Sequence, residues 1–201
     1  MSRVVVLGGG ESGVGSAVLA KVKGYDVFLS DMGQIPEKYT AVLDQWEIPY
    51  EQGRHSEELI LNADEVVKSP GIPPKAPMVQ KIVENGIGII SEIEFAGRYD
   101  TAKKVCITGS NGKTTTTSLI YHLLQQAGLN VGLGGNIGKS YAYQVATEQH
   151  DLCPGTQQFP AGQRIRFQGG HCHHHQHHSG SSGQIRLQDG ELCKVKVPHH
   201  T

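Results

Sequence analysis

The fold class follows from residues 4–13, which read Val4-Val-Val-Leu-Gly-Gly-Gly-Glu-Ser-Gly13. The β-branched run at 4–7 is typical of a strand that is buried in a parallel sheet. It leads directly into a Gly-x-Gly-x-x-Gly turn, and residues 14–22 then show the apolar spacing of a helix. A strand, a glycine turn and a helix in this order predict the first βα unit of a Rossmann-like domain.

The alternation of strands and helices continues to about residue 145. Further strands are predicted at 25–29, 65–67, 88–90 and 105–108, and helices at 77–84, 92–97 and 113–127. Strands separated by helices indicate a parallel sheet with right-handed crossovers. Because charged residues at 100–104 precede a new strand, we expect two α/β domains, a Rossmann-like one at 1–97 and the start of another at 98–150.

The glycine turn at 8–13 is the first candidate ligand site. Glycines let the backbone approach a ligand closely, and the helix N-terminus that follows offers free N–H groups to a phosphate. Asp31 ends the second strand, about 20 residues further on, where a carboxylate can accept a hydrogen bond from a ribose hydroxyl. This arrangement favours a nucleotide site over a turn chosen for packing alone, and both NAD and a UDP-sugar would suit it.

A second phosphate site is predicted at Thr108-Gly-Ser-Asn-Gly-Lys-Thr-Thr115, which follows an apolar strand and resembles a P-loop. Lys113 would reach the β- and γ-phosphates of ATP, and the Thr114 hydroxyl would bind Mg²⁺. The usual P-loop pattern requires glycine at position 107, where this chain has Ile107. The alternative is a helix N-cap turn with a solvated lysine, but the coincidence of strand, loop, lysine and hydroxyl favours the start of a P-loop ATPase domain.

Two weaker patterns lie at Lys68-Ser-Pro-Gly-Ile-Pro-Pro74 and at Gly134-Gly-Asn-Ile-Gly138. The first follows a predicted strand, at the end where open α/β sheets bind ligands. Taken alone, each is merely a loop. Together with the two glycine turns, the four motifs resemble those of the Mur ligases over about the first 150 residues, and the shortened P-loop is that family's own variant.

The resemblance implies an ATP-dependent ligase that forms an amide through an acyl phosphate. It is greatest to members that add D-glutamate to UDP-N-acetylmuramoyl-L-alanine in peptidoglycan precursor synthesis. An NAD-dependent oxidoreductase would explain residues 8–13 and Asp31 but would leave residues 109–115 without a role. A non-catalytic nucleotide-binding module is the other alternative.

The resemblance also assigns roles to individual residues. The uridine diphosphate would be bound by Gly10, Glu11, Ser12 and Asp31, with Ser69 and Gly71 near that substrate and Asn136 at its muramoyl part. ATP would be bound by Gly109, Ser110, Asn111, Gly112, Lys113, Thr114 and Thr115. Lys113 and Thr114 would be the catalytic residues, with Thr114 on the Mg²⁺.

The composition is compatible with an enzyme whose substrates are small molecules. The net charge of −1 gives no electrostatic reason to expect nucleic acid or a polybasic membrane partner. No apolar run approaches the roughly 20 residues that span a bilayer, and the N-terminus does not read as a signal peptide. The four cysteines form no Cys-x-x-Cys pair, which suits a reducing cytoplasm.

Residues 151–201 differ in character, because Gln, Gly and His dominate and most of the 11 histidines lie here. We expect an irregular or disordered tail without a core. A metal-binding tract and a tag with its linker are two interpretations of this tail.

A change of reading frame is the interpretation we favour. Shifted by one base, codons compatible with residues 152–162 spell Y-V-L-E-L-S-S-F-Q-L, and those for 168–187 spell K-A-D-I-A-I-I-T-N-I-T-P-D-H-L-D-R-Y-D-Y. Both phrases resemble the central domain of Mur ligases, and the first contains the glutamate that binds Mg²⁺ in that family. The sequence therefore predicts an incomplete fragment with little or no ligase activity.

Overall fold

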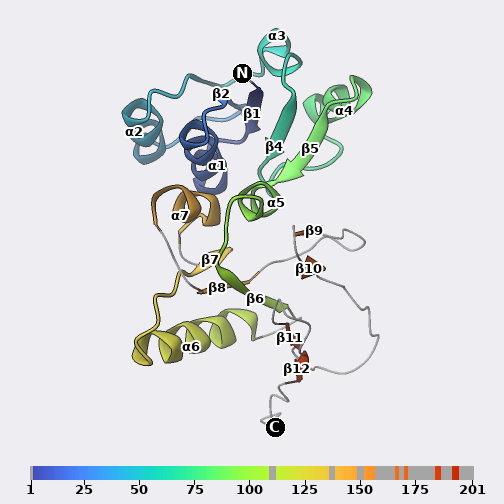
Figure 1. Cartoon of the computed structure of the whole chain (residues 1–201). Coiled ribbons are helices and arrows are strands. Elements are labelled where there is room, and N and C mark those ends of the chain that lie inside the picture. The colour runs from blue at the N-terminus through green and yellow to red at the C-terminus, as the bar shows by residue number, and fades with distance from the viewer. Residues whose placement is uncertain are drawn as a thin grey trace. The chain divides into compact units, whose positions relative to one another are not determined.

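The structure is a computed structural model of the whole chain (Figure 1). It describes residues 2–108, 112–135 and 139–148, together with the backbone of short strands at 152–156, 166–167, 170–171, 184–186 and 192–194. The chain divides into two compact units. The first contains Met1–Tyr99 and Ser140–Glu148, and the second contains Asp100–Lys139 and Gln149–Thr201.

The first unit is built on a five-stranded parallel sheet, which confirms the predicted α/β fold. Its strands are β1 (Arg3–Leu7), β2 (Asp26–Asp31), β3 (Tyr50–Gln52), β4 (Glu65–Lys68) and β5 (Gly88–Ser91), in the order β3-β2-β1-β4-β5. Every neighbouring pair is parallel. The chain order reverses at β1, so the carboxyl ends of β1 and β4 form the switch point where such sheets bind ligands.

Six helices belong to this unit. They are α1 (Glu11–Val22), α2 (Glu37–Gln45), α3 (Glu57–Ile60), α4 (Pro77–Glu84), α5 (Glu92–Gly97) and α7 (Tyr141–Thr147). Figure 1 shows α7 lying beside α1 and α5, and the contacts between these helices agree. Residues 141–147 fall within the range 98–150 that the sequence places in a second domain, yet they pack with the first unit. The predicted division into domains at 1–97 and 98–150 and a tail at 151–201 stays a prediction.

The core lies on both faces of the sheet. Val5 and Leu7 of β1 pack with Phe28, Val66 and residues of α3 and α4. The alternate residues Val4 and Val6 point to the other face, because successive side chains of a strand alternate. The side chains of Val4, Val5, Val6 and Leu7 are almost completely buried. Helix α1 is buried continuously at positions 13–20, which agrees with its contacts to β1 and β2 on one side and to α5 and α7 on another.

The second unit contains β6 (Lys103–Thr108), α6 (Lys113–Gln126), β7 (Gly134–Gly135), β8 (Leu152–Thr156), β11 (Gln184–Arg186) and β12 (Leu192–Lys194). The strand order is β12-β11-β6-β8-β7, with β8 parallel to β6 and β7 and with β11 antiparallel to β6. Strands β9 (Arg166–Phe167) and β10 (Gly170–His171) form a separate antiparallel pair.

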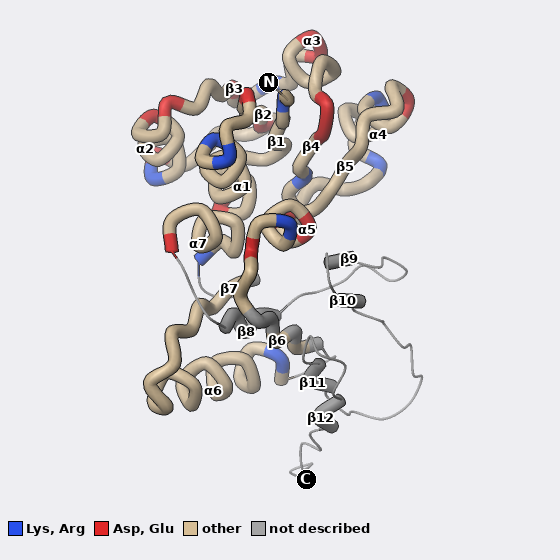
Figure 2. Tube along the Cα trace, viewed as in Figure 1, with Lys and Arg blue, Asp and Glu red and all other residues tan. Residues whose placement is uncertain are grey.

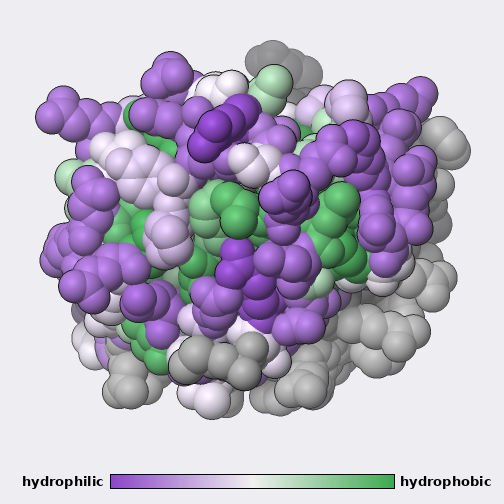
Figure 3. Space-filling view, turned by 90° about the horizontal axis from the view of Figure 1, so that it is seen from above, coloured by the Kyte–Doolittle hydropathy of each residue, from purple (hydrophilic) through white to green (hydrophobic). Residues whose placement is uncertain are grey.

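Acidic and basic residues are interspersed over the helices of the first unit (Figure 2), in keeping with the near-zero net charge. Seen from above, hydrophobic residues form patches between hydrophilic ones (Figure 3). Among the described residues, no helix is both long enough and apolar enough to cross a bilayer.

Candidate functional site

The turn between β1 and α1 can be made only with glycine at two positions. Gly8 has a φ of +100°, which L side chains rarely adopt, and its N–H donates to the Ser30 carbonyl at 2.9 Å. A Cβ on Gly13 would lie 1.8 Å from the Gly8 carbonyl oxygen. A Cβ on Gly10, by contrast, would have nothing within 4 Å. The turn is therefore tightly closed at its base and open at its tip.

Helix α1 starts at this open tip without a side-chain cap. Its N-cap is Gly10, in an extended conformation with φ −81° and ψ −172°. The Gly10 carbonyl accepts the first helical hydrogen bond, from the Val14 N–H at 2.9 Å. The first N–H groups of an uncapped helix and its positive dipole end attract an anion. The geometry of residues 10–12 thus suits a phosphate group.

Asp31 fixes the turn from the neighbouring strand. Its Oδ2 accepts from the Gly9 N–H at 2.5 Å, and its Oδ1 accepts from the Gly33 N–H at 2.7 Å. The carboxylate thereby links the turn after β1 to the turn after β2. Each carboxylate oxygen has two lone pairs, so a ribose hydroxyl can still be accepted. The predicted ligand role of Asp31 is compatible with this geometry and stays a prediction.

Ser69 brings the end of β4 to the same turn. A Cβ on Gly8 would lie 2.7 Å from the Ser69 hydroxyl, and the Ser69 N–H donates to the Leu7 carbonyl at 2.9 Å. Within the described part of the chain the buried Ser69 hydroxyl has no hydrogen-bond partner. The Ser69 hydroxyl could therefore form a hydrogen bond with a ligand at the base of the glycine turn. A Cβ on Gly71 would have nothing within 4 Å, so Gly71 does not pack closely against the glycine turn as Ser69 does.

Lys68 stabilises the loop that carries Ser69. Its Nζ donates to the carbonyls of Ser69 at 3.1 Å and Ile72 at 2.7 Å. Burial lowers the pKa of Lys68 below its ordinary value. This ammonium therefore shapes the loop through backbone carbonyls.

A buried polar network holds the turn that follows β3. The Ser30 hydroxyl lies 2.7 Å from Glu51 Oε1 and 2.7 Å from His55 Nδ1. Glu51 also accepts from the Ser56 N–H and hydroxyl, at 2.7 and 2.6 Å, and from Arg54. Burial raises the pKa of Glu51, but the hydrogen bonds from Ser56 and Ser30 outweigh it, and the net pKa is lowered.

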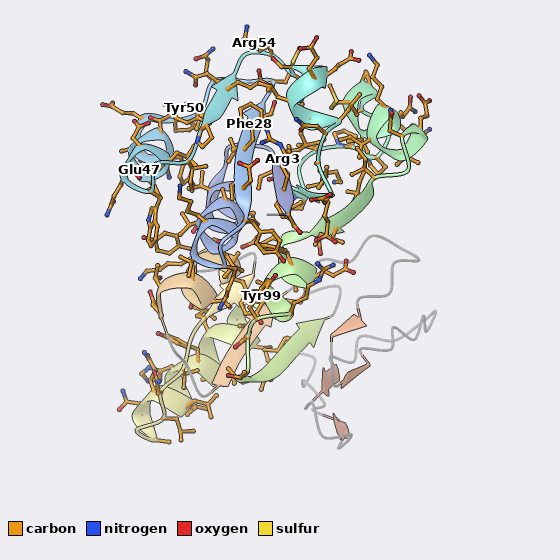
Figure 4. The ribbon with its side chains drawn as sticks, turned by 45° about the horizontal axis from the view of Figure 1, so that its top comes forward. Arg3, Phe28, Glu47, Tyr50, Arg54 and Tyr99 are labelled. Atoms are coloured by element: carbon orange, nitrogen blue, oxygen red, sulfur yellow. The ribbon has the colours of Figure 1, made fainter. Side chains whose placement is uncertain are left out.

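The ionised Glu51 also determines the histidine tautomer. A carboxylate only accepts, so the single Ser30 hydroxyl proton goes to Glu51. Ser30 must then accept from His55, whose Nδ1 carries a proton. Burial lowers the pKa of His55, while the charges of Glu51 and Asp31 oppose that effect. Figure 4 labels Arg54, which precedes His55 on the loop after β3.

A second buried network joins the glycine turn to α7. Glu92, the first residue of α5, is 6% exposed. Its Oε1 accepts from the Ser140 hydroxyl at 2.6 Å and from the Ala142 N–H at 3.1 Å. Burial raises the pKa of Glu92, and the nearby charge of Glu11 raises it further.

This network engages two of the predicted substrate residues. The Ser12 hydroxyl lowers the pKa of Glu92 and so opposes the effect of burial on that carboxyl. Glu11 Oε1 accepts from the Ser140 N–H at 3.1 Å. Sequence reasoning missed Glu92 and Ser140, because their partners lie far away in the chain. The one local signal is Ser91, which caps α5 by accepting from the Glu94 N–H at 3.2 Å, as Ser-x-x-Glu predicts.

The described part of the predicted ATP site is the start of α6. Gly112 is its N-cap, with a φ of +76°, and a Cβ at that position would have nothing within 4 Å. Thr114 and Thr115 are exposed and Lys113 is half-buried. The predicted residues Gly109, Ser110 and Asn111 lie outside the described residues, as does Asn136 of the muramoyl site.

Comparison with known families identifies the regions that contain the two glycine turns. Residues 2–91 match the N-terminal domain of MurD-like Mur ligases, and residues 107–157 match the Mur ligase middle domain. The chain belongs to the Mur ligase family. The prediction made from the four motifs is thereby confirmed, and the two Mur ligase matches correspond to the two glycine turns.

Individual Mur ligases extend this similarity. The chain is 68% identical over 151 residues to a UDP-N-acetylmuramoylalanine--D-glutamate ligase of Bacteroides fragilis, and 66% identical over 151 residues to that of Bacteroides thetaiotaomicron. The enzyme of Chlorobium phaeobacteroides is 40% identical over 149 residues. The first two alignments cover 75% of this chain and 34% of each relative, so the chain spans about a third of their length.

A solved Mur ligase structure shares the fold. It is the UDP-N-acetylmuramate:L-alanyl-gamma-D-glutamyl-meso-diaminopimelate ligase of Neisseria meningitides, with a TM-score of 0.53 and 24% identity. The match covers 78% of this chain and 52% of that one.

Proposed function

We propose that this chain carries the nucleotide-substrate domain and the beginning of the ATP-binding domain of a cytoplasmic ligase that adds D-glutamate to UDP-N-acetylmuramoyl-L-alanine. The observation that carries the proposal is the identity of 66–68% to two ligases with that name, over a stretch that contains both glycine turns. In the complete reaction, cleavage of ATP to ADP and phosphate drives formation of the amide bond.

The first unit would bind the uridine nucleotide at the carboxyl edge of its sheet. The free N–H groups at residues 10–12 would hold the diphosphate, and the remaining lone pairs of Asp31 would accept from the ribose. The unpartnered Ser69 hydroxyl would donate to the same ligand. The open space at Gly10 supports this assignment, because a phosphate can approach the backbone there.

The start of α6 fits a second phosphate group. Gly112 leaves the helix N-terminus open, and the exposed Thr114 carries a hydroxyl of the kind that binds Mg²⁺. Lys113 and Thr114, with residues 109–112 and Thr115, would hold ATP and its Mg²⁺. Bound there, ATP would supply the phosphoryl group that activates the substrate carboxylate. Lys113 would orient that group and offset its negative charge.

Residues 151–201 would be translated out of frame, and this chain would then lack ligase turnover. The alignments to the two Bacteroides relatives support a change of frame close to codon 150, because they span 151 residues and leave the last quarter of this chain unmatched. The Mg²⁺-binding glutamate that the shifted frame encodes would be missing from this chain.

The test of the nucleotide role is binding of UDP to the full chain by titration calorimetry. We expect saturable binding that Gly10→Val abolishes, because a side chain there fills the open tip without meeting other atoms. NADH fluorescence titration serves as the competing arm. Binding of NADH, or UDP binding unaffected by Gly10→Val, would contradict the proposal.

The test of the frame uses the coding DNA. We expect no ADP release that depends on both UDP-N-acetylmuramoyl-L-alanine and D-glutamate from the present chain. Correcting the frame near codon 150 in a full-length gene should produce that activity, and the matched Lys113→Met gene should not. Robust turnover by the present chain would refute the predicted inactivity.

A further inference from the structure

Two carboxylates from different helices converge on one residue at the start of α7. Ser140 donates its N–H to Glu11 Oε1 at 3.1 Å and its hydroxyl to Glu92 Oε1 at 2.6 Å. Glu11 is the first residue of α1, and Glu92 is the first residue of α5. Ser140 therefore links α7 to the first turns of both helices.

The packing around this joint is too close to be incidental. A Cβ on Gly15 of α1 would lie 1.9 Å from the Ser140 hydroxyl and 3.0 Å from the Tyr143 nitrogen. Glycine at position 15 is thus required for α7 to reach the backbone of α1. Figure 1 shows the two helices side by side.

The joint determines where the charge of Glu11 lies. A carboxylate in the first turn of a helix is attracted to the free N–H groups there. Those N–H groups, at residues 10–12, are the ones expected to bind the diphosphate. By accepting from Ser140, Glu11 is directed to α7, and it does not compete with an anion for the helix terminus.

We propose that Glu11 is a positioning residue that couples the docking of α7 to nucleotide binding by the glycine turn. With α7 docked, Ser140 holds the Glu11 carboxylate and the turn accepts a diphosphate. With α7 released, the carboxylate lies over the helix terminus and repels the diphosphate. This inference rests on the proposed function, because it requires the turn to bind a uridine diphosphate.

The arrangement also makes the coupling reciprocal. If docking of α7 raises the affinity for a diphosphate, a bound diphosphate must favour docking by the same factor. Glu92 strengthens the link, since it accepts both from the Ser140 hydroxyl and from the Ala142 N–H of α7.

The decisive experiment removes the N–H that Glu11 accepts. Ser140 has a φ of −47°, near the value that proline imposes, and Lys139 before it is in a β-bridge, so Ser140→Pro suits the local backbone. UDP affinity is measured by calorimetry on the full chain for the wild type, Ser140→Pro, Glu11→Gln and the double variant. Ser140→Ala, which keeps the N–H, is the matched control.

We expect Ser140→Pro to weaken UDP binding about fivefold, the size of one charge–dipole interaction at a helix end. Whatever the affinity of Glu11→Gln, the double variant should bind UDP within about twofold of it, because without the carboxylate the Ser140 N–H has no charge to hold. The loss should shrink in concentrated NaCl because it is electrostatic. Ser140→Ala should stay within about twofold of the wild type.

A purely structural role would give a different pattern. In that case Glu11→Gln would not restore binding to Ser140→Pro, and the loss would not depend on salt; either result overturns the inference. Hydrogen exchange on the wild type is a second measurement, in which saturating UDP should slow the amides of α7. Unchanged α7 exchange in a chain that binds UDP overturns the coupling alone, whereas absence of UDP binding overturns the proposed function itself.

Discussion

Replacing Gly13 by alanine tests whether the glycine turn is as tightly closed as its geometry indicates. The new Cβ would lie 1.8 Å from the Gly8 carbonyl oxygen and 2.9 Å from its carbon, and real Cβ contacts essentially never fall below 3.0 Å. Both atoms belong to the backbone and cannot rotate away. The turn between β1 and α1 must therefore open by about 1.2 Å to accommodate one methyl group.

The expected cost follows from two opposing effects. Overpacking of a closed site costs about 1–3 kcal/mol, and the upper part of that range applies where backbone must move. Alanine is favoured over glycine in a helix by about 1 kcal/mol, which offsets part of the loss. We expect Gly13→Ala to lower the free energy of unfolding of the first unit by about 2 kcal/mol.

The assay is guanidinium chloride unfolding followed by tryptophan fluorescence. The chain has one tryptophan, Trp46, which is the C-cap of α2 and reports on the first unit. With a denaturant slope of about 4 kcal/mol per molar, the midpoint should fall by about 0.5 M. Gly10→Ala is the control, because its Cβ meets nothing within 4 Å, and it should cost less than about 1 kcal/mol as a poorer N-cap. Equal midpoints for Gly13→Ala and the wild type would refute the reasoning.

Two further predictions concern pH. Because the folded pKa of Glu51 is lowered, its contribution is present above pH 4.5 and is lost as pH falls through the folded pKa. Glu51→Gln should lower the free energy of unfolding at neutral pH by about 1–3 kcal/mol. It should also make that free energy fall less steeply as the pH is lowered into the acid range. If the variant loses stability in acid as steeply as the wild type, the prediction is contradicted. Burial and the hydrogen bond with Tyr25 raise the pKa of Tyr99 to about 12, so folding is favoured less as pH rises from 10 to 12. In an alkaline absorbance titration, Tyr99→Phe should remove a tyrosine that ionises at higher pH than an ordinary phenol. If the tyrosine that disappears has an ordinary pKa, the contact between Tyr25 and Tyr99 is not supported.

The sequence predicts well the elements whose ends are marked by nearby residues. Helices α4 and α5 begin and end where expected, with proline at the start of α4 and a serine cap on α5. Helix α1 begins at Glu11, three residues before its apolar spacing starts, because the turn itself supplies the N-cap. The segments α2, β3 and α3 escape prediction, since they carry neither clear periodicity nor a capping box.

In the candidate site, too, some features have a local signal in the sequence and others form only when the chain is folded. The position of Asp31 follows from its spacing after the glycine turn, but its partners Gly9 and Gly33 emerge only when β1 and β2 are paired. The contact between Glu92 and Ser140 joins residues 48 positions apart and has no local signal. Long-range contacts of buried polar groups are set by packing, and a single sequence does not reveal them.

The glycine turn combines an expected anion site with three nearby carboxylates, and this requires a physical explanation. Asp31 accepts from two N–H groups, Glu11 accepts from Ser140, and Glu92 accepts from Ser140 and Ala142. Each carboxyl group is thus directed to donors of the protein. The helix terminus at residues 10–12 keeps its own N–H groups for a ligand. Affinity for a diphosphate would then depend on backbone dipoles and on the donors that hold the carboxylates. The consequence is that removing a donor such as the Ser140 N–H should weaken binding even though no ligand contact is lost.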